Sequence, residues 1–372
     1  MNAPLKIGLV SETWAPEVNG VAMTMSRLTR GLRERGHCIH VVRPRQKNET
    51  TPRPGETLVS GFPLPGYNGL QFGLPAERTL SRLWQENRPD VVHVVTEGPL
   101  GWSALRAARR AGIPVTSSYH THFDGYTKHY GARLVGPLIA AWLRRFHRRT
   151  QATLAPTTAL AEKLRKTGVP DAWVLGRGVD TKLFSPERRS ESIRDEWGVG
   201  PEELVVLNVG RLAPEKNLRL AARAFEAIEA ENPRARMVWV GDGPSRAYLE
   251  RNHPRHLFTG TQQGEALATY YASADLFLFP SLTETYGNVV AEAMASGLAV
   301  LAYHDAAAAE LIVSSENGLT VPPGAADAFV TAACRLARDK HLRQRCREAA
   351  RARVEPLGWE AVISDFESLL HE

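Results

Sequence analysis

The sequence predicts an α/β protein made of two doubly wound, Rossmann-like domains that face a central cleft. Short apolar stretches of strand length alternate with amphipathic stretches of helix length, which is typical of a parallel sheet covered on both faces. The alternation starts again at residue 205, and the stretch at residues 176–186 separates the two series. A chain of 372 residues is long enough for two such domains, and we place the boundary near residue 180.

The first half of the chain carries the first series of elements. Short apolar runs predict strands at residues 6–10, 38–42, 91–95, 115–118 and 152–155. Apolar residues at helical spacing predict helices at residues 21–32, 76–86, 101–111 and 132–149. Residues 52–75 are rich in proline and glycine and are predicted to form a loop with at most a short strand.

The second half repeats the pattern. Strands are predicted at residues 205–209, 237–240, 276–279, 299–301 and 319–321. The clearest helices are predicted at residues 218–230 and 288–296, and Gly297 suits the carboxyl-terminal cap of the latter. In two sheets of this kind, ligands bind outside the carboxyl ends of the strands, so the loops that follow the strands are the candidate site.

The net charge of +6 is unevenly distributed. Residues 1–183 carry 26 Lys or Arg and 13 Asp or Glu, and the remaining residues carry 20 and 27, so +6 divides into +13 and −7. A basic half can face anionic lipid headgroups, nucleic acid or an anionic small molecule, or it can be an ordinary arginine-rich surface. No recognition module for nucleic acid is found, so no nucleic-acid partner is expected.

The cysteines and the amino terminus predict a cytoplasmic protein. Cys38, Cys334 and Cys346 lack the spacing of a metal site and are expected to be free thiols of a reducing compartment. Lys6 leads directly into an apolar strand, without the charged and then apolar order of a secretory leader. No apolar run approaches the roughly 18 residues that a membrane-spanning helix needs.

The strongest motif follows the predicted strand at residues 276–279. It reads Pro-Ser-Leu-Thr-Glu-Thr-Tyr-Gly-Asn and leads into a helix, whose exposed N–H groups and dipole attract anions. Glu284 and Glu292 are eight positions apart, about 12 Å along a continuous helix. That exceeds the roughly 5–9.5 Å of a glycosidase carboxyl pair, so we expect the two acids to hold opposite ends of a long polar ligand.

A second motif follows the predicted strand at residues 205–209. Arg211 and Lys216 lie on the loop that leads into the next helix. A guanidinium fork and an ammonium group beside a helix start suit a diphosphate, and they would stabilise the charge of a departing phosphate. A solvated pair with Glu215 as a local partner is the alternative.

Two loops of the first half follow strands in the same way. The loop after residue 118 carries His120, His122, Asp124 and Tyr126, which could contact hydroxyls or a reacting carbon, although a structural histidine is an equally good interpretation. His120 and His122 lack an evident third and fourth ligand, so no metal is predicted. The loop before Gly20 enters a helix and brings backbone N–H groups to the same edge.

Taken together, these motifs resemble the retaining nucleotide-sugar glycosyltransferases of family four, which have the GT-B fold. The resemblance rests on Glu284 with Glu292, Arg211 with Lys216, Gly241-Asp242-Gly243-Pro244 and the Asn19-Gly20 loop, and it extends over nearly the whole chain. The blocks 96–99 and 119–126 are most similar to bacterial GDP-mannose-dependent α-mannosyltransferases and glycolipid glycosyltransferases. Asn19 stands where the family often has a first glycine.

The resemblance implies roles for individual residues. Arg211, Lys216 and Gly20 would contact the donor diphosphate, and Glu292 the ribose hydroxyls. Glu284 would contact the transferred sugar, and His120 would lie at the reaction centre, with His122, Asp124 and Tyr126 on the acceptor side. The backbone of the loop before the helix would hold sugar hydroxyls and phosphate; its residues are Thr285, Tyr286, Gly287 and Asn288. The family also implies three parts of the chain, an acceptor-side domain at 1–180, a donor domain at 181–352, and a last helix within 353–372 that returns to the first domain.

The expected activity is therefore transfer of a hexose, with retention, from a nucleoside-diphosphate sugar to a hydroxyl acceptor. The donor is a substrate, GDP-mannose or UDP-glucose, and no cofactor or metal is expected because the cations stabilise the departing diphosphate. The acceptor is expected to be a lipid or a glycan. Residues 132–149 read as a basic amphipathic helix, which predicts peripheral contact with the inner face of an anionic cytoplasmic membrane, or else a packed helix with a solvated face. An epimerase of the same architecture and a nucleic-acid binder are the alternatives.

Overall fold

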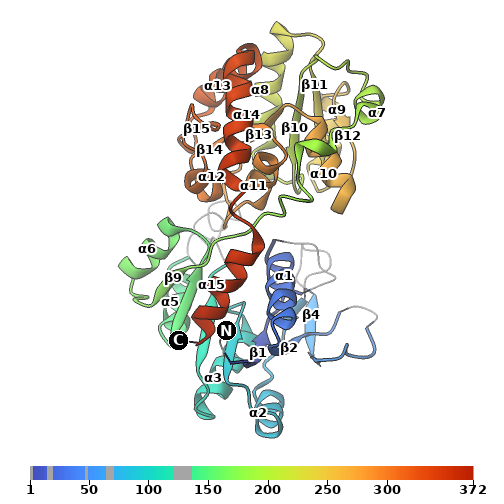
Figure 1. Cartoon of the computed structure of the whole chain (residues 1–372). Coiled ribbons are helices and arrows are strands. Elements are labelled where there is room, and N and C mark those ends of the chain that lie inside the picture. Colours follow the sequence, from blue (N-terminus) through green and yellow to red (C-terminus); the bar gives the residue numbers. More distant parts are fainter. Residues whose placement is uncertain (1–2, 15–19, 47–48, 64–70, 121–135, 372) are drawn as a thin grey trace. The chain divides into compact units, whose positions relative to one another are not determined.

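The computed structural model describes residues 3–14, 20–46, 49–63, 71–120 and 136–371. The chain divides into two compact units, shown in Figure 1. Unit 1 consists of residues Met1–Arg177 and Trp359–Glu372, and unit 2 of residues Gly178–Gly358. The change of unit at Gly178 lies beside the boundary that the sequence predicts.

Unit 1 is built on a seven-stranded parallel sheet with the order β3-β2-β1-β6-β7-β8-β9. The strands are β1 (Lys6–Val10), β2 (Cys38–Pro44), β3 (Glu56–Val59), β6 (Val91–Val94), β7 (Val115–Ser118), β8 (Ala152–Ala155) and β9 (Ala172–Val174). A small antiparallel hairpin, β4 (Gly61–Pro63) and β5 (Gln71–Gly73), follows β3. The strand order reverses between β1 and β6, so the loops after these strands form the switch point of the sheet.

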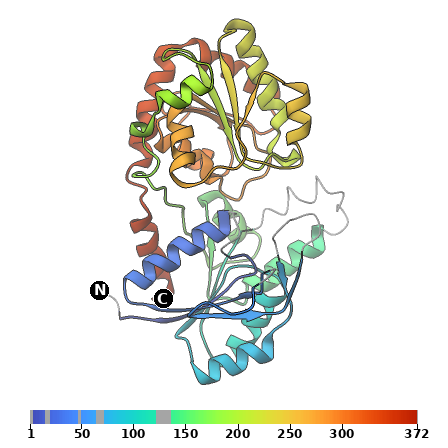
Figure 2. The same ribbon diagram turned by 90° about the vertical axis from the view of Figure 1, so that its right-hand side faces the viewer.

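Helices cover both faces of this sheet, as Figure 2 shows. They are α1 (Gly20–Glu34), α2 (Glu77–Glu86), α3 (Pro99–Arg110), α5 (Gly136–His147), α6 (Thr158–Lys166) and α15 (Trp359–His371). Leu28 of α1 and Phe366 of α15 pack against Leu9 on one face, and Leu80 of α2 and Leu105 of α3 belong to the core of the other. Burial of these apolar side chains at about 25 cal/mol per Å² is the main force that holds the layers together.

Unit 2 repeats the design with a six-stranded parallel sheet in the order β12-β11-β10-β13-β14-β15. Its strands are β10 (Val205–Val209), β11 (Arg236–Val240), β12 (Leu257–Phe258), β13 (Leu276–Phe279), β14 (Ala299–Tyr303) and β15 (Leu319–Val321). The order reverses between β10 and β13. Both predicted motifs of the second half follow these two strands and therefore lie at the switch point.

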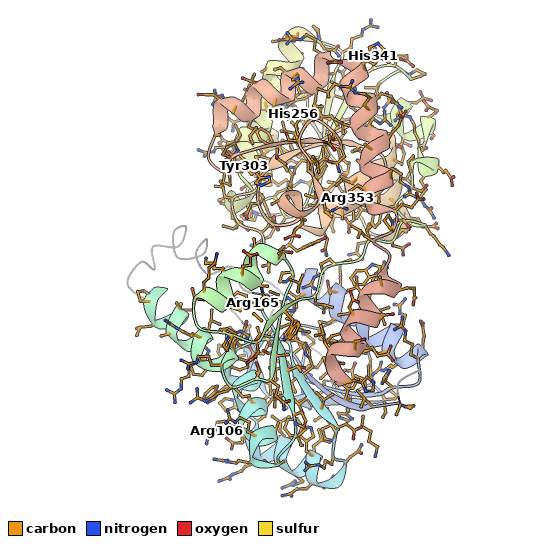
Figure 3. All side chains as sticks on the ribbon, turned by 60° about the vertical axis from the view of Figure 1, so that its left-hand side comes forward. Arg106, Arg165, His256, Tyr303, His341 and Arg353 are labelled. Carbon is orange, nitrogen blue, oxygen red and sulfur yellow. The ribbon has the colours of Figure 1, made fainter. Side chains whose placement is uncertain are left out.

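Two apolar cores, one on each face, connect this sheet to its helices. The helices are α7 (Glu191–Glu196), α8 (Leu218–Glu231), α9 (Arg246–Asn252), α10 (Gly264–Ser273), α11 (Asn288–Ala295), α12 (Ala306–Leu311), α13 (Ala326–Arg338) and α14 (Lys340–Val354). Buried polar groups are paired as well: Trp239 Nε1 donates to His256 Nδ1 at 3.1 Å, and Figure 3 labels His256 in this unit. This bond satisfies two ring nitrogens that burial removes from water.

The last helix belongs to unit 1. Helix α15 packs along α1, and Arg27 of α1 lies over the Trp359 ring, 5.4 Å from its centroid. The sequence placed the returning segment within 353–372, whereas α14 continues to Val354 and the chain enters unit 1 at Trp359. Among the described residues, no helix has both the length and the apolar composition needed to cross a membrane.

The GT-B expectation of two Rossmann-like sheets is confirmed, with differences at the weakest elements. Helix α6 and the short strands β9 and β12 were not predicted, and residues 52–75 contain three short strands instead of one. A strand of two or three residues is too short to show a period, which is why the pattern does not reveal it. Residues 132–135 of the predicted basic helix lie outside the described residues, and the described helix is α5.

Candidate donor and acceptor sites

The switch point of unit 2 is built from backbone packed closely against backbone. Gly210 and Gly241 follow neighbouring strands with φ values of 145° and 137°, which side chains rarely allow. A Cβ atom on Gly241 would lie 1.9 Å from the carbonyl oxygen of Gly210, so only glycine fits there. The Leu212 N–H donates to the Asp242 carbonyl at 2.9 Å, which fixes the start of the loop that carries Arg211 and Lys216.

Lys216 and Glu284 form an ion pair across this switch point. Lys216 ends the 3₁₀ turn Pro214–Lys216 after β10, and Glu284 lies on the loop after β13. The Leu282 N–H donates to the Glu215 carbonyl at 3.0 Å, so the two loops are also joined through the backbone. The side chains of the pair are 20% and 16% exposed. The ammonium group is thus held at the edge of the sheet while it stays accessible to a ligand.

Arg211 is held differently from Lys216. Its side chain is 39% exposed, and its Nη1 lies 3.8 Å from Glu215 Oε1 on the same loop. The guanidinium therefore lies near Glu215, the local partner named as the alternative in the sequence analysis. An exposed pair of this kind contributes little to stability, and an anionic ligand can replace the carboxylate as partner at small cost.

The loop after β13 ends at a helix start, as predicted. Gly287 caps α11 with a φ of 86°, and the predicted helix from residue 288 is α11. Tyr286 is buried, and its carbonyl accepts from the Ala307 N–H at 2.7 Å, which anchors the loop that also carries Thr285. The buried Oγ of Ser281 has no hydrogen-bond partner among the described residues. The first N–H groups of α11, from Asn288 onward, form an anion-attracting end next to the Lys216 loop.

Glu292 lies on α11 and has its own partner. The hydroxyl of Tyr271, on α10, donates to Glu292 Oε2 at 3.1 Å. Burial raises the pKa of Tyr271 well above its usual value, and the Glu292 carboxylate raises it further, so the phenol keeps its proton. Glu284 and Glu292 thus have different partners, a lysine and a tyrosine. The sequence analysis did not predict a role for Tyr271, because no motif in its helix distinguishes this tyrosine from an ordinary core residue.

The structure describes only some of the site residues that were predicted in unit 1. Gly20 is the exposed first residue of α1, whereas Asn19, His122, Asp124 and Tyr126 lie outside the described residues. His120 follows β7, and its Nδ1 lies 3.1 Å from Nη2 of Arg177. Burial lowers the pKa of His120 well below its usual value, and Arg177 lowers it further.

Two carboxyl groups at the switch point of unit 1 were missed by sequence reasoning. Glu12 follows β1, is buried, and accepts from the Leu100 N–H at the start of α3 at 3.0 Å. Burial raises the pKa of Glu12 from 4.5 to about 7, and the charge of Glu97 adds to the rise, against the lowering effect of the Leu100 bond. Glu97 follows β6, and its Oε1 lies 3.2 Å from Nε2 of the buried His147 on α5. The sequence did contain a signal for these two residues, because Glu12 and Glu97 directly follow the strands at the switch point.

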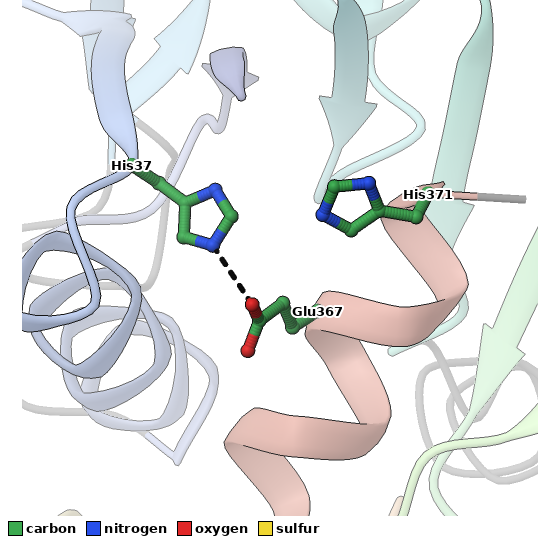
Figure 4. A group of neighbouring side chains, drawn as sticks. All are labelled: His37, Glu367 and His371. Atoms are coloured by element: carbon green, nitrogen blue, oxygen red, sulfur yellow. Dashed lines mark hydrogen bonds and ion pairs between the residues drawn. The ribbon is translucent and has the colours of Figure 1, made fainter. Parts of the chain in front are cut away.

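A cluster of His37, Glu367 and His371 lies on the opposite side of the same unit and is drawn in Figure 4. His37 Nε2 lies 3.2 Å from Glu367 Oε1, and Arg35 Nη1 donates to Glu367 Oε2 at 2.7 Å. The Leu5 N–H donates to His37 Nδ1 at 3.0 Å, so a neutral His37 carries its proton on Nε2 and donates it to Glu367. A metal on Nε2 would have to displace that proton. The cluster therefore fits a clamp that holds α15 on unit 1.

Comparisons with known proteins identify both halves of the chain. Residues 18–183 match the Glycosyltransferase Family 4 model, and residues 189–353 match the Glycosyl transferases group 1 model. A GDP-mannose-dependent alpha-mannosyltransferase of Mycobacterium tuberculosis is 36% identical over 97% of this chain and 95% of its own length. A sulfoquinovosyl transferase of Arabidopsis thaliana is 33% identical over 93% of this chain and 69% of its own length.

More distant relatives and solved structures are also similar to this chain. An alpha-monoglucosyldiacylglycerol synthase of Acholeplasma laidlawii is 26% identical over 85% of this chain and 84% of its own length. Among solved structures, sucrose-phosphate synthase of Thermosynechococcus elongatus has a TM-score of 0.79 at 20% identity, covering 98% of both chains. Anabaena HepE, solved in complex with UDP, has the same TM-score at 19% identity, covering 98% of this chain and 99% of its own.

Proposed function

Since the chain belongs to glycosyltransferase family 4, we propose that it transfers a hexose from a nucleoside-diphosphate sugar to a hydroxyl group. The observation that carries the proposal is the Lys216–Glu284 ion pair, which lies at the switch point of unit 2 on the loops that also lead to the start of α11. Cations and a helix start at one sheet edge suit a diphosphate. The named relatives are transferases or synthases, so nothing favours the epimerase or the nucleic-acid binder.

Different residues of unit 2 bind different parts of the donor. Lys216 and Arg211 neutralise the diphosphate, and Glu284 both orients Lys216 and accepts from a hydroxyl of the transferred sugar. Glu292 accepts from the ribose hydroxyls, and Tyr271 keeps the carboxylate oriented through its 3.1 Å hydrogen bond. A carboxylate that already accepts one hydrogen bond is held in one direction, so less entropy is lost when the ribose binds.

The proposed reaction retains the configuration at the anomeric carbon. The bond between that carbon and the phosphate oxygen breaks, the acceptor oxygen bonds to the carbon from the same face, and the acceptor's proton passes to the departing phosphate oxygen. Lys216 and Arg211 stabilise the charge that develops on the diphosphate. Because these cations take the place of a divalent ion, we expect turnover to persist in a chelator. An NMR spectrum of the product would show retention as the α-anomer.

GDP-mannose is the first donor to test, because the mannosyltransferase relative has high identity over nearly the whole chain. UDP-glucose is the second. A lipid is the proposed acceptor, since one of the named relatives is an alpha-monoglucosyldiacylglycerol synthase. A charged nucleotide sugar and free thiols both suit the cytoplasm, so we propose the inner face of the cytoplasmic membrane as the place of action, which cell fractionation would test.

Helix α5 carries the proposed membrane contact. Leu138 and Trp142 on this helix are 70% and 37% exposed, and Arg144 on the helix and Arg148 just after its end are exposed as well. Exposed apolar side chains next to arginines suit the interface of an anionic bilayer. Flotation with anionic and with neutral vesicles tests this, and a Leu138→Asn, Arg148→Gln double variant should lose binding to the anionic vesicles. Equal flotation of the variant and the wild type would contradict the proposal.

The central test of the function is Lys216→Met. Loss of an oriented cation that stabilises the leaving group should lower kcat by about 10²–10³-fold, with a smaller effect on donor KM. Lys340→Met is the matched control, because it removes an exposed ion pair with Glu202 in the same unit, far outside the switch-point loops. The readout is acceptor-dependent release of nucleoside diphosphate. The assignment would be refuted if Lys216→Met turned over at the wild-type rate. It would also be refuted if the wild type released as much sugar without acceptor as with it.

A further inference from the structure

Arg177 is a hydrogen-bond partner of His120, although the two residues are far apart along the chain. His120 follows β7 and Arg177 follows β9, so both lie at the carboxyl edge of one sheet, separated by β8. Nη2 of Arg177 lies 3.1 Å from Nδ1 of His120, and the family resemblance implies that His120 lies at the reaction centre.

The guanidinium of Arg177 is held in place by the backbone. Its Nη1 donates to the Leu175 and Gly176 carbonyls, both at 3.3 Å, and the residue is buried. Backbone oxygens thus fix the guanidinium plane independently of any ligand. The fork that points at His120 is therefore part of the folded unit and does not depend on a bound sugar.

The chemistry of the two groups then decides where the proton of His120 sits. A guanidinium has five N–H donors, no acceptor, and does not deprotonate in proteins. The ring nitrogen that faces it, Nδ1, must therefore accept and cannot carry a proton. A neutral imidazole has one N–H, so the proton is on Nε2.

The surroundings of the ring keep it neutral. Among the described residues, Arg177, His93 from β6 and His147 from α5 are charged or titratable groups near the ring, and each lowers the pKa of His120 in addition to burial. His93 is itself bonded to Thr116 and Ser118 Oγ atoms at 2.8 and 2.9 Å, and His147 to Ser117 Oγ at 2.9 Å. Protonation of Nδ1 would place two positive groups 3.1 Å apart.

We propose that Arg177 is a positioning residue of the transfer site, which holds His120 as the neutral tautomer with its proton on Nε2. In this state Nε2 of His120 donates a hydrogen bond to a hydroxyl of the sugar or the acceptor, and the one ring lone pair that could remove a proton, on Nδ1, is taken up by Arg177. The acceptor's proton accordingly goes to the departing phosphate oxygen. The inference rests on the proposed function for its catalytic meaning, whereas the tautomer itself is a property of unit 1.

The tautomer can be measured directly by nitrogen NMR on the full chain labelled in its histidines, with the His120 signals assigned through His120→Gln. In the wild type we expect Nδ1 to resonate as a bare nitrogen and Nε2 as a protonated one, unchanged from about pH 5.5 to 8.5. In Arg177→Met we expect the two nitrogens to share the proton, because the donor that keeps Nδ1 bare is lost. Arg177→Lys, which keeps a cationic donor, should restore the wild-type pattern.

The matched control is Arg165→Met. Arg165 is labelled in Figure 3, and its Nε donates to the Ala172 carbonyl of β9 at 2.9 Å, so it is also an arginine bonded to backbone at this edge strand. Arg177→Met should lower kcat/KM by about 10- to 100-fold, while Arg165→Met should leave kcat/KM unchanged.

The outcomes separate the two proposals. A proton on Nδ1 of the wild type, titration of His120 near neutral pH, or an unchanged ring in Arg177→Met would overturn this inference even if hexose transfer is observed. A bare Nδ1 together with no turnover of any nucleotide sugar would instead contradict the proposed function. The wild-type spectrum gives a result even if Arg177→Met fails to fold.

Discussion

The buried carboxyl of Glu12 makes the stability of unit 1 depend on pH in a direction opposite to most carboxyl groups. Its pKa rises from 4.5 to about 7, chiefly because burial penalises the charged form. The folded state therefore binds the proton more tightly than the unfolded state. The stabilisation is fully present below pH 4.5 and is lost as the pH rises through 7.

The size of the effect follows from the shift. A displacement from 4.5 to about 7 corresponds to about 3 kcal/mol in total, of which roughly 2.5 kcal/mol is lost between pH 5 and pH 8. Glu12→Gln removes the titration and keeps a carbonyl oxygen that can accept from the Leu100 N–H. We expect the variant to be less dependent on pH than the wild type by that amount, and the more stable of the two at pH 8.

The assay is urea unfolding of the wild type and the variant at both pH values. Glu162→Gln, which changes an exposed carboxyl group on α6 of the same unit, is the control and should follow the wild type. The difference between variant and wild type cancels the titration of every other group. If the wild type and Glu12→Gln lose the same free energy of unfolding between pH 5 and pH 8, the reasoning about burial is refuted.

Two further predictions concern unit 2. Gly241→Ala should destabilise the unit by at least about 3 kcal/mol in urea unfolding, since its Cβ would lie 1.9 Å from the Gly210 carbonyl oxygen. Gly264→Ala separates this clash from backbone strain, because Gly264 has a φ of 56° but no atom within 4 Å of its Cβ, and it should cost only about 1–2 kcal/mol. Tyr271→Phe removes the hydrogen bond to Glu292 and should raise donor KM by about three- to tenfold in initial-rate measurements with little change in kcat, whereas a fall in kcat at constant KM would contradict a ribose-orienting role.

Much of the fold and part of the candidate site could be predicted from the pattern of residues. Strands such as Val205–Val209 and Leu276–Phe279 are short, wholly buried runs that alternate with amphipathic helices, and this local pattern is sufficient to predict parallel sheets. Parallel strands end at one edge, so the loops with Lys216 and Glu284 had to lie at that edge. The resemblance to the glycosyltransferase family rested on the same loops.

The partners of these side chains could be known only once the sheets were folded. Lys216 pairs with Glu284 across two strands that are neighbours in the sheet, whereas Arg211 contacts Glu215 on its own loop, and both outcomes were compatible with the sequence. Burial of Glu12, and the bond between His120 and Arg177, likewise depend on segments that are far apart along the chain. Hydrophobic periodicity records which face of an element is buried, but the direction and environment of a polar side chain depend on packing between elements that the chain brings together only in three dimensions.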